Sequence, residues 1–333
     1  MPWRSAVRPD LALDIRETSH TSAGMAAYTR ALRRELPRVA PDLTLVEVGT
    51  GDNFDLAEQI GLPLTLARLR PRLAHFPTPF VPRFVPVPYI VTVHDLIDLE
   101  FPQWAKPKVG PYWRALVSPV LRGARAVITD DQATVALLER HCGVSPNRVR
   151  VVPLGVDAPN PLPAPRMHPR PYIFYAGNRR PHKDLRTLVE AWRGLPEESA
   201  CDLLLTGDDD GDPALAGTVA LGTLDERALW SAYRGAAAYV QPSLREGFGL
   251  PLLEAVRAGT PAIGTMTGTP QALAPFVRRY EAGDAGGLRA LLVSALRDPS
   301  AHSRAERARE ETVGLTWAAT ASATAAVYRE VLR

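Results

Sequence analysis

Short apolar runs alternate with segments typical of helices along most of the chain. The runs at 89–93 and 126–129 are rich in β-branched residues, as buried strands of a parallel sheet are. The pattern predicts strands at 11–15, 43–48, 89–93, 126–129, 148–153, 172–175, 203–206, 237–241 and 261–264, and helices at 25–36, 131–141, 184–194, 226–235, 251–258 and 317–332. This alternation indicates an α/β protein with parallel sheets covered on both faces, whose ligands bind at the carboxyl ends of the strands.

Proline residues divide the chain. Among the 32 prolines, two groups stand close together in the chain, at 77–88 and at 153–171. Proline continues neither a helix nor a central strand. The second cluster is the better linker candidate, because regular patterns resume on both sides of it. We predict two doubly wound, Rossmann-like domains that face each other across a cleft: residues 1–157, joined by a C-terminal helix at 317–333 that crosses back, and residues 158–316.

Composition narrows the class of protein. The chain of 333 residues is 46% hydrophobic and 23% charged, which is typical of a soluble globular protein. Its two cysteines, Cys142 and Cys201, cannot form a disulfide framework and indicate a reducing compartment. No apolar run reaches the roughly 18 residues of a membrane span, and the N-terminus lacks the apolar core of a signal peptide. The expected location is the cytoplasm.

The net charge of +3 is too weak an excess to indicate a nucleic-acid partner. It is compatible with an anionic substrate or an anionic membrane surface. Residues 104–125 carry tryptophan, tyrosine, lysine and arginine side chains that suit peripheral contact with the inner face of a membrane. An amphipathic helix packed on its own domain is the simpler interpretation of the same stretch.

The first segment with candidate chemistry is 242–254 (PSLREGFGLPLLE), which follows a predicted strand and leads into a helix. Gly247 and Gly249 allow the backbone to approach a ligand closely, and the free N–H groups at a helix start favour an anion such as a diphosphate. Glu246 and Glu254 could accept hydrogen bonds from two parts of one polyol ligand. Taken singly, Glu246 could be a capping carboxylate and Glu254 a solvated helix residue.

The second segment is 177–185 (GNRRPHKDL), again between a strand and a helix. It gathers Arg179, Arg180, His182 and Lys183 at a strand end. Cleavage of a sugar–diphosphate bond builds negative charge on the leaving phosphate, and cations placed there lower the barrier. A solvated basic turn is the alternative interpretation.

Together these segments resemble the retaining GT-B glycosyltransferases of family 4, whose signature is the spacing of Glu246 and Glu254. The resemblance extends over nearly the whole chain, through 91–96 (VTVHDL), 151–157 (VVPLGVD), 224–243 and the helix that contains Trp317. It implies that a nucleotide-sugar donor, GDP-mannose or a UDP-hexose, binds mainly in the C-terminal domain. The implied acceptor is a glycan, a lipid-linked sugar or a small molecule.

The resemblance also implies roles for individual residues. Glu246 would hold the donor sugar, Glu254 the ribose, and Lys183 with Arg179 the diphosphate. His94 would lie across the cleft near the reacting sugar, although a structural strand-end histidine is the alternative. Further donor contacts are expected at Gly24, Gly177, Asn178, Gly247, Phe248, Gly249 and Leu250.

The chain departs from the family pattern in several places. Asn178 stands where arginine is usual, 24–26 reads Gly-Met-Ala in place of Gly-x-Gly, the stretch 206–224 is short, and Gln271 replaces a common glutamate. The run Asp208 to Asp210 has the D-x-D spacing that binds metal in glycosyltransferases of another fold, but a solvated loop is the simpler interpretation. No metal cofactor is expected.

The sequence therefore predicts a retaining hexosyltransferase, with mannose as the first candidate sugar and another hexose, glucose among them, close behind. Two other functions stay open. One is a nucleotide-sugar epimerase or phosphorylase of the same fold. The other is a non-catalytic binding protein, which the intact Glu246, Glu254 and Lys183 disfavour.

Overall fold

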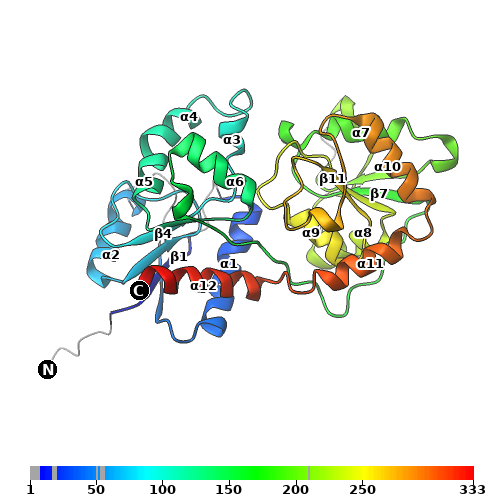
Figure 1. Ribbon diagram of the computed structural model, residues 1–333. Helices are drawn as coiled ribbons and strands as arrows, with labels where there is room; N and C mark the ends of the chain where they lie inside the picture. The colour runs from blue at the N-terminus through cyan, green and yellow to red at the C-terminus, as the bar shows by residue number, and fades with distance from the viewer. Residues whose placement is uncertain (1–7, 17–20, 50–51, 53–56, 209–210) are drawn as a thin grey trace. The chain divides into compact units, whose positions relative to one another are not determined.

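The computed structural model describes residues 8–16, 21–49, 52, 57–208 and 211–333. The chain divides into two compact units, one formed by Met1–Gly155 with Thr316–Arg333 and the other by Val156–Leu315 (Figure 1). The sequence predicts boundaries between the units at 157/158 and 316/317, and the structure has these boundaries at 155/156 and 315/316. Each unit is built on its own six-stranded sheet.

The sheet of the N-terminal unit is parallel throughout, in the order β2-β1-β3-β4-β5-β6. Its strands are β1 (Leu11–Asp14), β2 (Leu45–Val48), β3 (Leu73–Phe76), β4 (Tyr89–Thr92), β5 (Ala126–Thr129) and β6 (Val149–Val151). All residues of β1, β3 and β5 are buried, as expected for strands covered on both faces. Sequence reasoning missed β3.

The helices of this unit are α1 (Ala23–Val39), α2 (Leu62–Leu69), α3 (Ile97–Glu100), α4 (Val109–Tyr112), α5 (Ser118–Gly123), α6 (Gln132–Leu137) and α12 (Trp317–Leu332), with π-helical turns at Ala57–Gly61, Trp113–Val117 and Leu138–Cys142. Ser22 caps α1, its hydroxyl accepting from the Met25 N–H. The helix continues through Pro37 to Val39 rather than ending at 36. Pro37 supplies no backbone N–H to the last turn of this helix.

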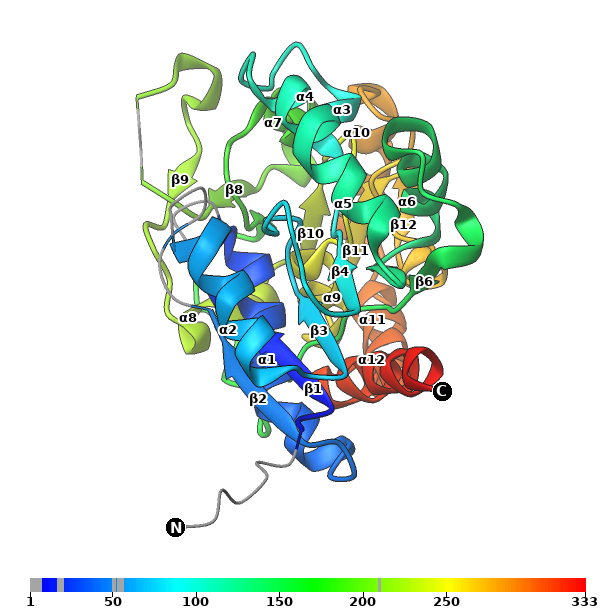
Figure 2. The same ribbon diagram turned by 90° about the vertical axis from the view of Figure 1, so that its left-hand side faces the viewer.

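Helix α12 packs beside α1, as both views of the molecule show (Figures 1 and 2). Ala321, Ala325 and Tyr328 of this helix are fully buried. The Tyr328 hydroxyl lies 2.7 Å from Nδ1 of His75 on β3, and the Thr320 hydroxyl donates to the Pro153 carbonyl at 3.0 Å. The last helix is therefore part of the N-terminal unit's core.

The basic and aromatic stretch folds onto its own unit. Residues 109–123 form α4, a π-helical turn and α5, and Val117, Val120 and Leu121 are buried in the core. Trp104 stacks on Phe101 and stays 43% exposed. No helix in the described residues is long and apolar enough to span a bilayer.

The sheet of the C-terminal unit has the order β12-β11-β10-β7-β8-β9, with parallel pairing between all neighbours. Its strands are β7 (Tyr172–Tyr175), β8 (Asp202–Leu205), β9 (Val219–Ala220), β10 (Ala238–Gln241), β11 (Ala262–Thr265) and β12 (Arg278–Tyr280). The helices are α7 (Leu185–Arg193), α8 (Glu226–Gly235), α9 (Leu250–Arg257), α10 (Ala285–Arg297) and α11 (Ala301–Glu311). Helices α7 and α10 pack together on one face of the sheet, and α8, α9 and α11 cover the other (Figure 1).

The proline-rich stretch 153–171 contains no helix or strand. Its second half is nevertheless fixed to α8, because the Arg166 N–H donates to the Ser231 carbonyl at 2.8 Å and the Ser231 hydroxyl donates to the Ala164 carbonyl at 2.7 Å. Residues 163–166 therefore belong to the packed C-terminal unit and are not a free linker.

The strand order of the C-terminal sheet is that of dinucleotide-binding Rossmann folds. After β7 the chain runs outward through β8 to β9, then returns to the other side of β7 to form β10, β11 and β12. The order reverses between β7 and β10. In open α/β sheets this reversal point, at the carboxyl ends of the strands, is where ligands bind.

Candidate functional site

The two segments singled out in the sequence leave the sheet at this reversal point. Residues 176–184 follow β7 and residues 242–249 follow β10, and the two strands pair directly. The loops are also joined to each other, since the Leu244 N–H donates to the His182 carbonyl at 2.8 Å. The structure thus brings the basic turn and the glutamate loop into one place.

At the centre of this place, Lys183 Nζ lies 2.6 Å from Glu246 Oε1. The two side chains are only 12% and 9% exposed. The same carboxylate oxygen accepts from Gln241 Nε2 and from the Ser243 hydroxyl, each at 2.5 Å. Glu246 is therefore held by one cation and two neutral donors.

The glycine that begins the basic turn is required by its neighbours. A Cβ on Gly177 would lie 2.8 Å from the Tyr175 hydroxyl oxygen, which donates to the Asn178 carbonyl at 2.6 Å. The Gly177 N–H donates to the Thr206 hydroxyl at 3.0 Å. The Asn178 side chain accepts from the Arg180 N–H at 3.2 Å, so it stabilises the turn itself.

Arg179 is half-buried and directed toward the end of β8. Its Nη2 lies 4.0 Å from the position that a Cβ on Gly207 would occupy. The guanidinium therefore lies beside the same strand ends as Lys183. Of the acidic run that begins at Asp208, residues 209 and 210 lie outside the described residues.

The glycine-rich loop leads directly into α9. Gly249 adopts φ +69°, in the left-handed region that favours glycine, and Leu250 begins the helix. Gly249 provides no side-chain cap, Pro251 has no N–H, and the Leu252 N–H donates to the Gly249 carbonyl at 2.9 Å. Among the described residues, the Leu250 N–H is therefore the first-turn donor left for an anion. Gly247 and Phe248, which belong to this loop, are buried.

Glu254 lies in the second turn of α9, where its Oε2 accepts from the Tyr233 hydroxyl of α8 at 2.8 Å. Burial raises the pKa of Glu254 to about 7, and the hydrogen bond from Tyr233 opposes that rise. A carboxyl group buried beside one hydroxyl is an acceptor in need of donors, which the hydroxyls of a ribose could supply.

Two of the expected site residues lie in the N-terminal unit. Gly24 occupies the first turn of α1, which begins at Ala23 rather than at the predicted residue 25. His94 follows β4 and is 7% exposed. Its Nδ1 lies 2.6 Å from Asp130 Oδ2, and its Nε2 lies 3.2 Å from the Pro77 carbonyl oxygen.

Both ring nitrogens of His94 thus face acceptors, an arrangement that suits the doubly protonated imidazolium. Burial lowers the pKa of His94, but the Asp130 carboxylate and the Pro77 carbonyl raise it, and the net pKa lies above its ordinary value. The ring ties together the ends of β3, β4 and β5. This contact favours the alternative of a structural strand-end histidine, because neither nitrogen is left for proton transfer.

Sequence reasoning missed four residues that support the two glutamates: Tyr233, Tyr239, Gln241 and Ser243. The tyrosines resembled ordinary core residues within apolar runs. Gln241 carried a signal, because a buried polar residue at the carboxyl end of an apolar strand requires partners. Asp130 carried a similar signal at the end of β5.

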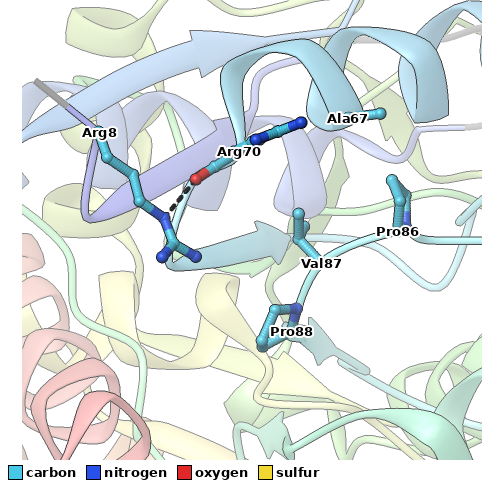
Figure 3. A pocket seen from close by; sticks show the side chains of 6 residues that line it. All are labelled: Arg8, Ala67, Arg70, Pro86, Val87 and Pro88. Carbon is cyan, nitrogen blue, oxygen red and sulfur yellow. Dashed lines mark hydrogen bonds between the residues drawn. The ribbon is translucent and has the colours of Figure 1, made fainter. Parts of the chain in front are cut away.

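A shallow pocket elsewhere in the N-terminal unit is lined by Arg8, Ala67, Arg70, Pro86, Val87 and Pro88. Figure 3 shows Arg8 reaching across it to the Arg70 carbonyl, with a distance of 2.6 Å from Nε to the oxygen. Its residues precede β1, β3 and β4, so the pocket lies at the amino ends of the strands. Of the expected site residues in this unit, His94 follows β4 at the opposite, carboxyl edge of the sheet.

Among the residues that the structure describes, no group of three or more His, Cys, Asp or Glu side chains could hold a metal ion.

Comparisons with known proteins match both units. Residues 34–160 match the profile of Glycosyltransferase Family 4, and residues 170–298 match that of Glycosyl transferases group 1. The chain is 32% identical over 143 residues to an O-antigen chain mannosyltransferase B of Escherichia coli, covering 39% of this chain and 38% of the relative. It is 27% identical over 270 residues to the MMP α-(1→4)-mannosyltransferase of Mycolicibacterium hassiacum, covering 74% of this chain and 66% of the relative.

Solved structures share the fold at low sequence identity. A sucrose-phosphate synthase from Thermosynechococcus elongatus has a TM-score of 0.73 and 20% identity, covering 97% of this chain and 99% of its own. The Anabaena protein HepE, solved in complex with UDP-glucose, has a TM-score of 0.73 and 15% identity, covering 96% of this chain and 99% of its own. Together with the two profile matches and the site at the β7–β10 reversal, these likenesses place the chain among the GT-B glycosyltransferases of family 4.

Proposed function

We propose that the protein transfers a hexose from a nucleotide-diphosphate sugar to a hydroxyl group of an acceptor, with retention of the anomeric configuration. The observation that carries the proposal is the Lys183–Glu246 pair, which is formed at the reversal point of the sheet with the start of α9 beside it. A cation, a carboxylate and the positive end of a helix are the chemistry that a sugar diphosphate requires.

The proposed reaction breaks the bond between the sugar C1 and the diphosphate oxygen, and the electron pair leaves with the diphosphate. The acceptor oxygen forms the new bond to C1 on the same face, and its proton passes to the leaving diphosphate. Lys183 and Arg179 would stabilise the charge that builds on that group. Glu246 would hold the hydroxyls of the reacting sugar, and Glu254 those of the ribose.

Mannose from GDP-mannose is the first candidate for the transferred sugar. Its support is the two relatives whose names describe mannosyltransferases. A UDP-hexose is the second candidate, supported by the shared fold with a protein that was solved with UDP-glucose. The acceptor would be a glycan, a lipid-linked sugar or a small molecule.

The test is to incubate the purified protein with GDP-mannose or UDP-glucose, with and without acceptors, and to measure release of the nucleoside diphosphate. Acceptor-dependent release of GDP or UDP, with an α-linked product by NMR, is expected. Conversion of donor alone to another nucleotide sugar, or release that depends on phosphate, would instead establish an epimerase or a phosphorylase. Binding without turnover would establish a non-catalytic protein.

We also propose that donor binding requires no divalent metal, since Lys183, Arg179 and the α9 amides carry the charge stabilisation. Turnover should be unchanged in excess EDTA. Loss of turnover in EDTA, with recovery on addition of Mn²⁺ or Mg²⁺, would contradict this assignment.

A further inference from the structure

Behind Glu246 lies a chain of buried hydrogen bonds that the proposed reaction does not by itself explain. The Tyr239 hydroxyl donates to Gln241 Oε1, and Gln241 Nε2 donates to Glu246 Oε1 and to the Ser243 hydroxyl oxygen. The Ser243 hydroxyl in turn donates to Glu246 Oε1. Tyr239, Gln241 and Ser243 are at most 1% exposed, so these bonds form out of contact with water.

The direction of every bond in this chain is fixed by its neighbours. Because the Glu246 carboxylate can only accept, the Gln241 amide must present its N–H groups to Glu246 and Ser243, and its carbonyl oxygen then accepts from Tyr239. Because the Ser243 oxygen accepts from Gln241, its own proton is directed to the carboxylate. The Tyr239 hydroxyl therefore anchors the carbonyl end of the Gln241 amide.

Gln241, Ser243 and Lys183 all donate to the same oxygen of Glu246, Oε1. Within the described part of the chain, none of them contacts Oε2. The carboxylate is thus fixed through Oε1 and has Oε2 available to a ligand. Gln241 and Ser243 would keep their hydrogen bonds to Oε1 if the Lys183 ammonium turned toward a diphosphate.

We propose that Gln241, anchored by Tyr239, is a positioning residue that holds Glu246 with Oε2 directed at the donor sugar. This inference rests on the proposed function, since it assumes that Glu246 binds the transferred hexose. The inference assigns different roles to the donors. Gln241 and Ser243 keep the Glu246 carboxylate in place, so that Lys183 can move to the diphosphate.

The first test compares Gln241→Leu and Tyr239→Phe with the unmodified protein in steady-state transfer assays. Loss of a hydrogen bond to a charged group should lower kcat roughly tenfold to hundredfold in Gln241→Leu, with a smaller change in donor KM. Tyr239→Phe removes the anchor at the carbonyl end of the amide but keeps its bonds to Glu246 and Ser243, so it should lower kcat by a smaller factor.

The matched control is Tyr172→Phe. Tyr172 is also buried in this sheet, and its hydroxyl donates to the Ala232 carbonyl at 2.8 Å without contacting the Glu246 network. It should keep kcat within about twofold of the unmodified protein. If Tyr239→Phe and Tyr172→Phe lower kcat equally, or if folded Gln241→Leu retains full kcat, the proposal is wrong.

The second test does not depend on turnover. The affinities for UDP-glucose and UDP, and for GDP-mannose and GDP, are measured by calorimetry. Gln241→Leu should reduce the affinity gained from the hexose and leave UDP or GDP binding unchanged. An unchanged gain would overturn the inference alone, whereas an unmodified protein that binds none of the four nucleotides would overturn the proposed function with it.

The third test uses charge. Gln241→Glu places a second carboxyl group against Glu246, and two carboxylates at this distance share a proton at low pH but repel each other once both are ionised. The ratio of variant to unmodified kcat should therefore fall as pH rises from about 6 to about 9. A ratio that does not change with pH would show that residue 241 acts only on folding and would contradict the positioning role.

Discussion

Glu246 and Glu254 lie eight residues apart in the chain, yet their surroundings differ. Glu246 receives Lys183, Gln241 and Ser243 on one oxygen. Among the residues that the structure describes, Glu254 receives the Tyr233 hydroxyl alone, and it is half-buried. The first carboxylate is held before any ligand arrives, and the second is left short of donors. Their loss should therefore have different consequences.

Glu246→Gln should mainly lower kcat, because the sugar it is proposed to hold becomes cation-like as the bond breaks. Glu254→Gln should mainly raise the donor KM, because the ribose does not change during the reaction. Either change removes a charged hydrogen bond worth about 1.5–3 kcal/mol. Donor titration of both variants, with circular dichroism as a control for folding, checks this. Full kcat in folded Glu246→Gln would remove Glu246 from the reacting sugar.

The raised pKa of Glu254 predicts a pH dependence of stability. The folded pKa of about 7 exceeds the ordinary value of 4.5, so the folded protein binds the proton more tightly than the unfolded chain does. The resulting stabilisation is fully present below about 4.5 and is lost as pH rises through about 7. Above that pH, the ionised carboxyl group opposes folding by up to about 3 kcal/mol.

Glu254→Gln removes this ionisation. Its melting temperature should exceed that of the unmodified protein at pH 8 and show little gain at pH 5, in differential scanning calorimetry at both values. Glu281→Gln, which changes an exposed glutamate, is the control and should behave the same at both pH values. An equal shift for Glu254→Gln at both pH values would contradict the buried ionisation.

Among individual residues of the candidate site, the sequence predicted the charged side chains and missed the side chains that orient them. Lys183 and Glu246 were identifiable because they stand in glycine-containing loops after strands. Tyr239 and Tyr233 were not, because a tyrosine in an apolar run has the same pattern whether or not its hydroxyl bonds a carboxylate. His94 was identified by its motif, but its ring proves to be held by Asp130 and Pro77. The direction of a ring depends on packing that the local sequence does not encode.

Among the elements, the strands that the sequence predicted are those with short, mostly apolar runs. The bounds of β5 and β7 agree with the prediction at both ends. Strand β3 was missed because His75 interrupts its apolar run, and that histidine is tolerated only because Tyr328 and Thr92 satisfy both of its nitrogens. Strand β12 was missed because it begins with two arginines.

The crossing between the units depends on a close backbone approach at Gly155. A Cβ there would lie 2.2 Å from the Thr316 carbonyl carbon, and backbone atoms cannot turn aside as a side chain can. Gly155→Ala should therefore separate β6 from the start of α12 and destabilise the N-terminal unit by about 1–3 kcal/mol.

The matched control for this change is Gly314→Ala, at a position where a Cβ would meet nothing within 4 Å. It should leave the urea unfolding midpoint nearly unchanged, whereas Gly155→Ala should lower it. Equal midpoints for the two variants would show that the 155–316 approach is not tight in solution.

For the whole molecule, the division into two units predicts which residues a bound nucleotide protects from hydrogen exchange. A nucleoside diphosphate that binds at the ends of β7 and β10 stabilises the unit it contacts by about 2.7 kcal/mol at 100 times its dissociation constant. Hydrogen exchange monitored by mass spectrometry should show slower exchange at 177–185 and 242–254 on addition of GDP or UDP. Exchange in β3, β4 and β5 should change little. Equal protection of both units would contradict a donor site carried by the C-terminal unit.

The return of α12 to the first unit also determines the order in which the protein can be completed during synthesis. Residues 156–315 leave the ribosome before Trp317–Leu332, so the C-terminal unit can fold as an independent domain while the other still lacks a helix. Until that helix arrives, His75 has no tyrosine hydroxyl beside it, and the surface that Ala321 and Ala325 will cover is exposed. The nascent N-terminal unit is therefore accessible to a chaperone or a protease for longer than the C-terminal unit is.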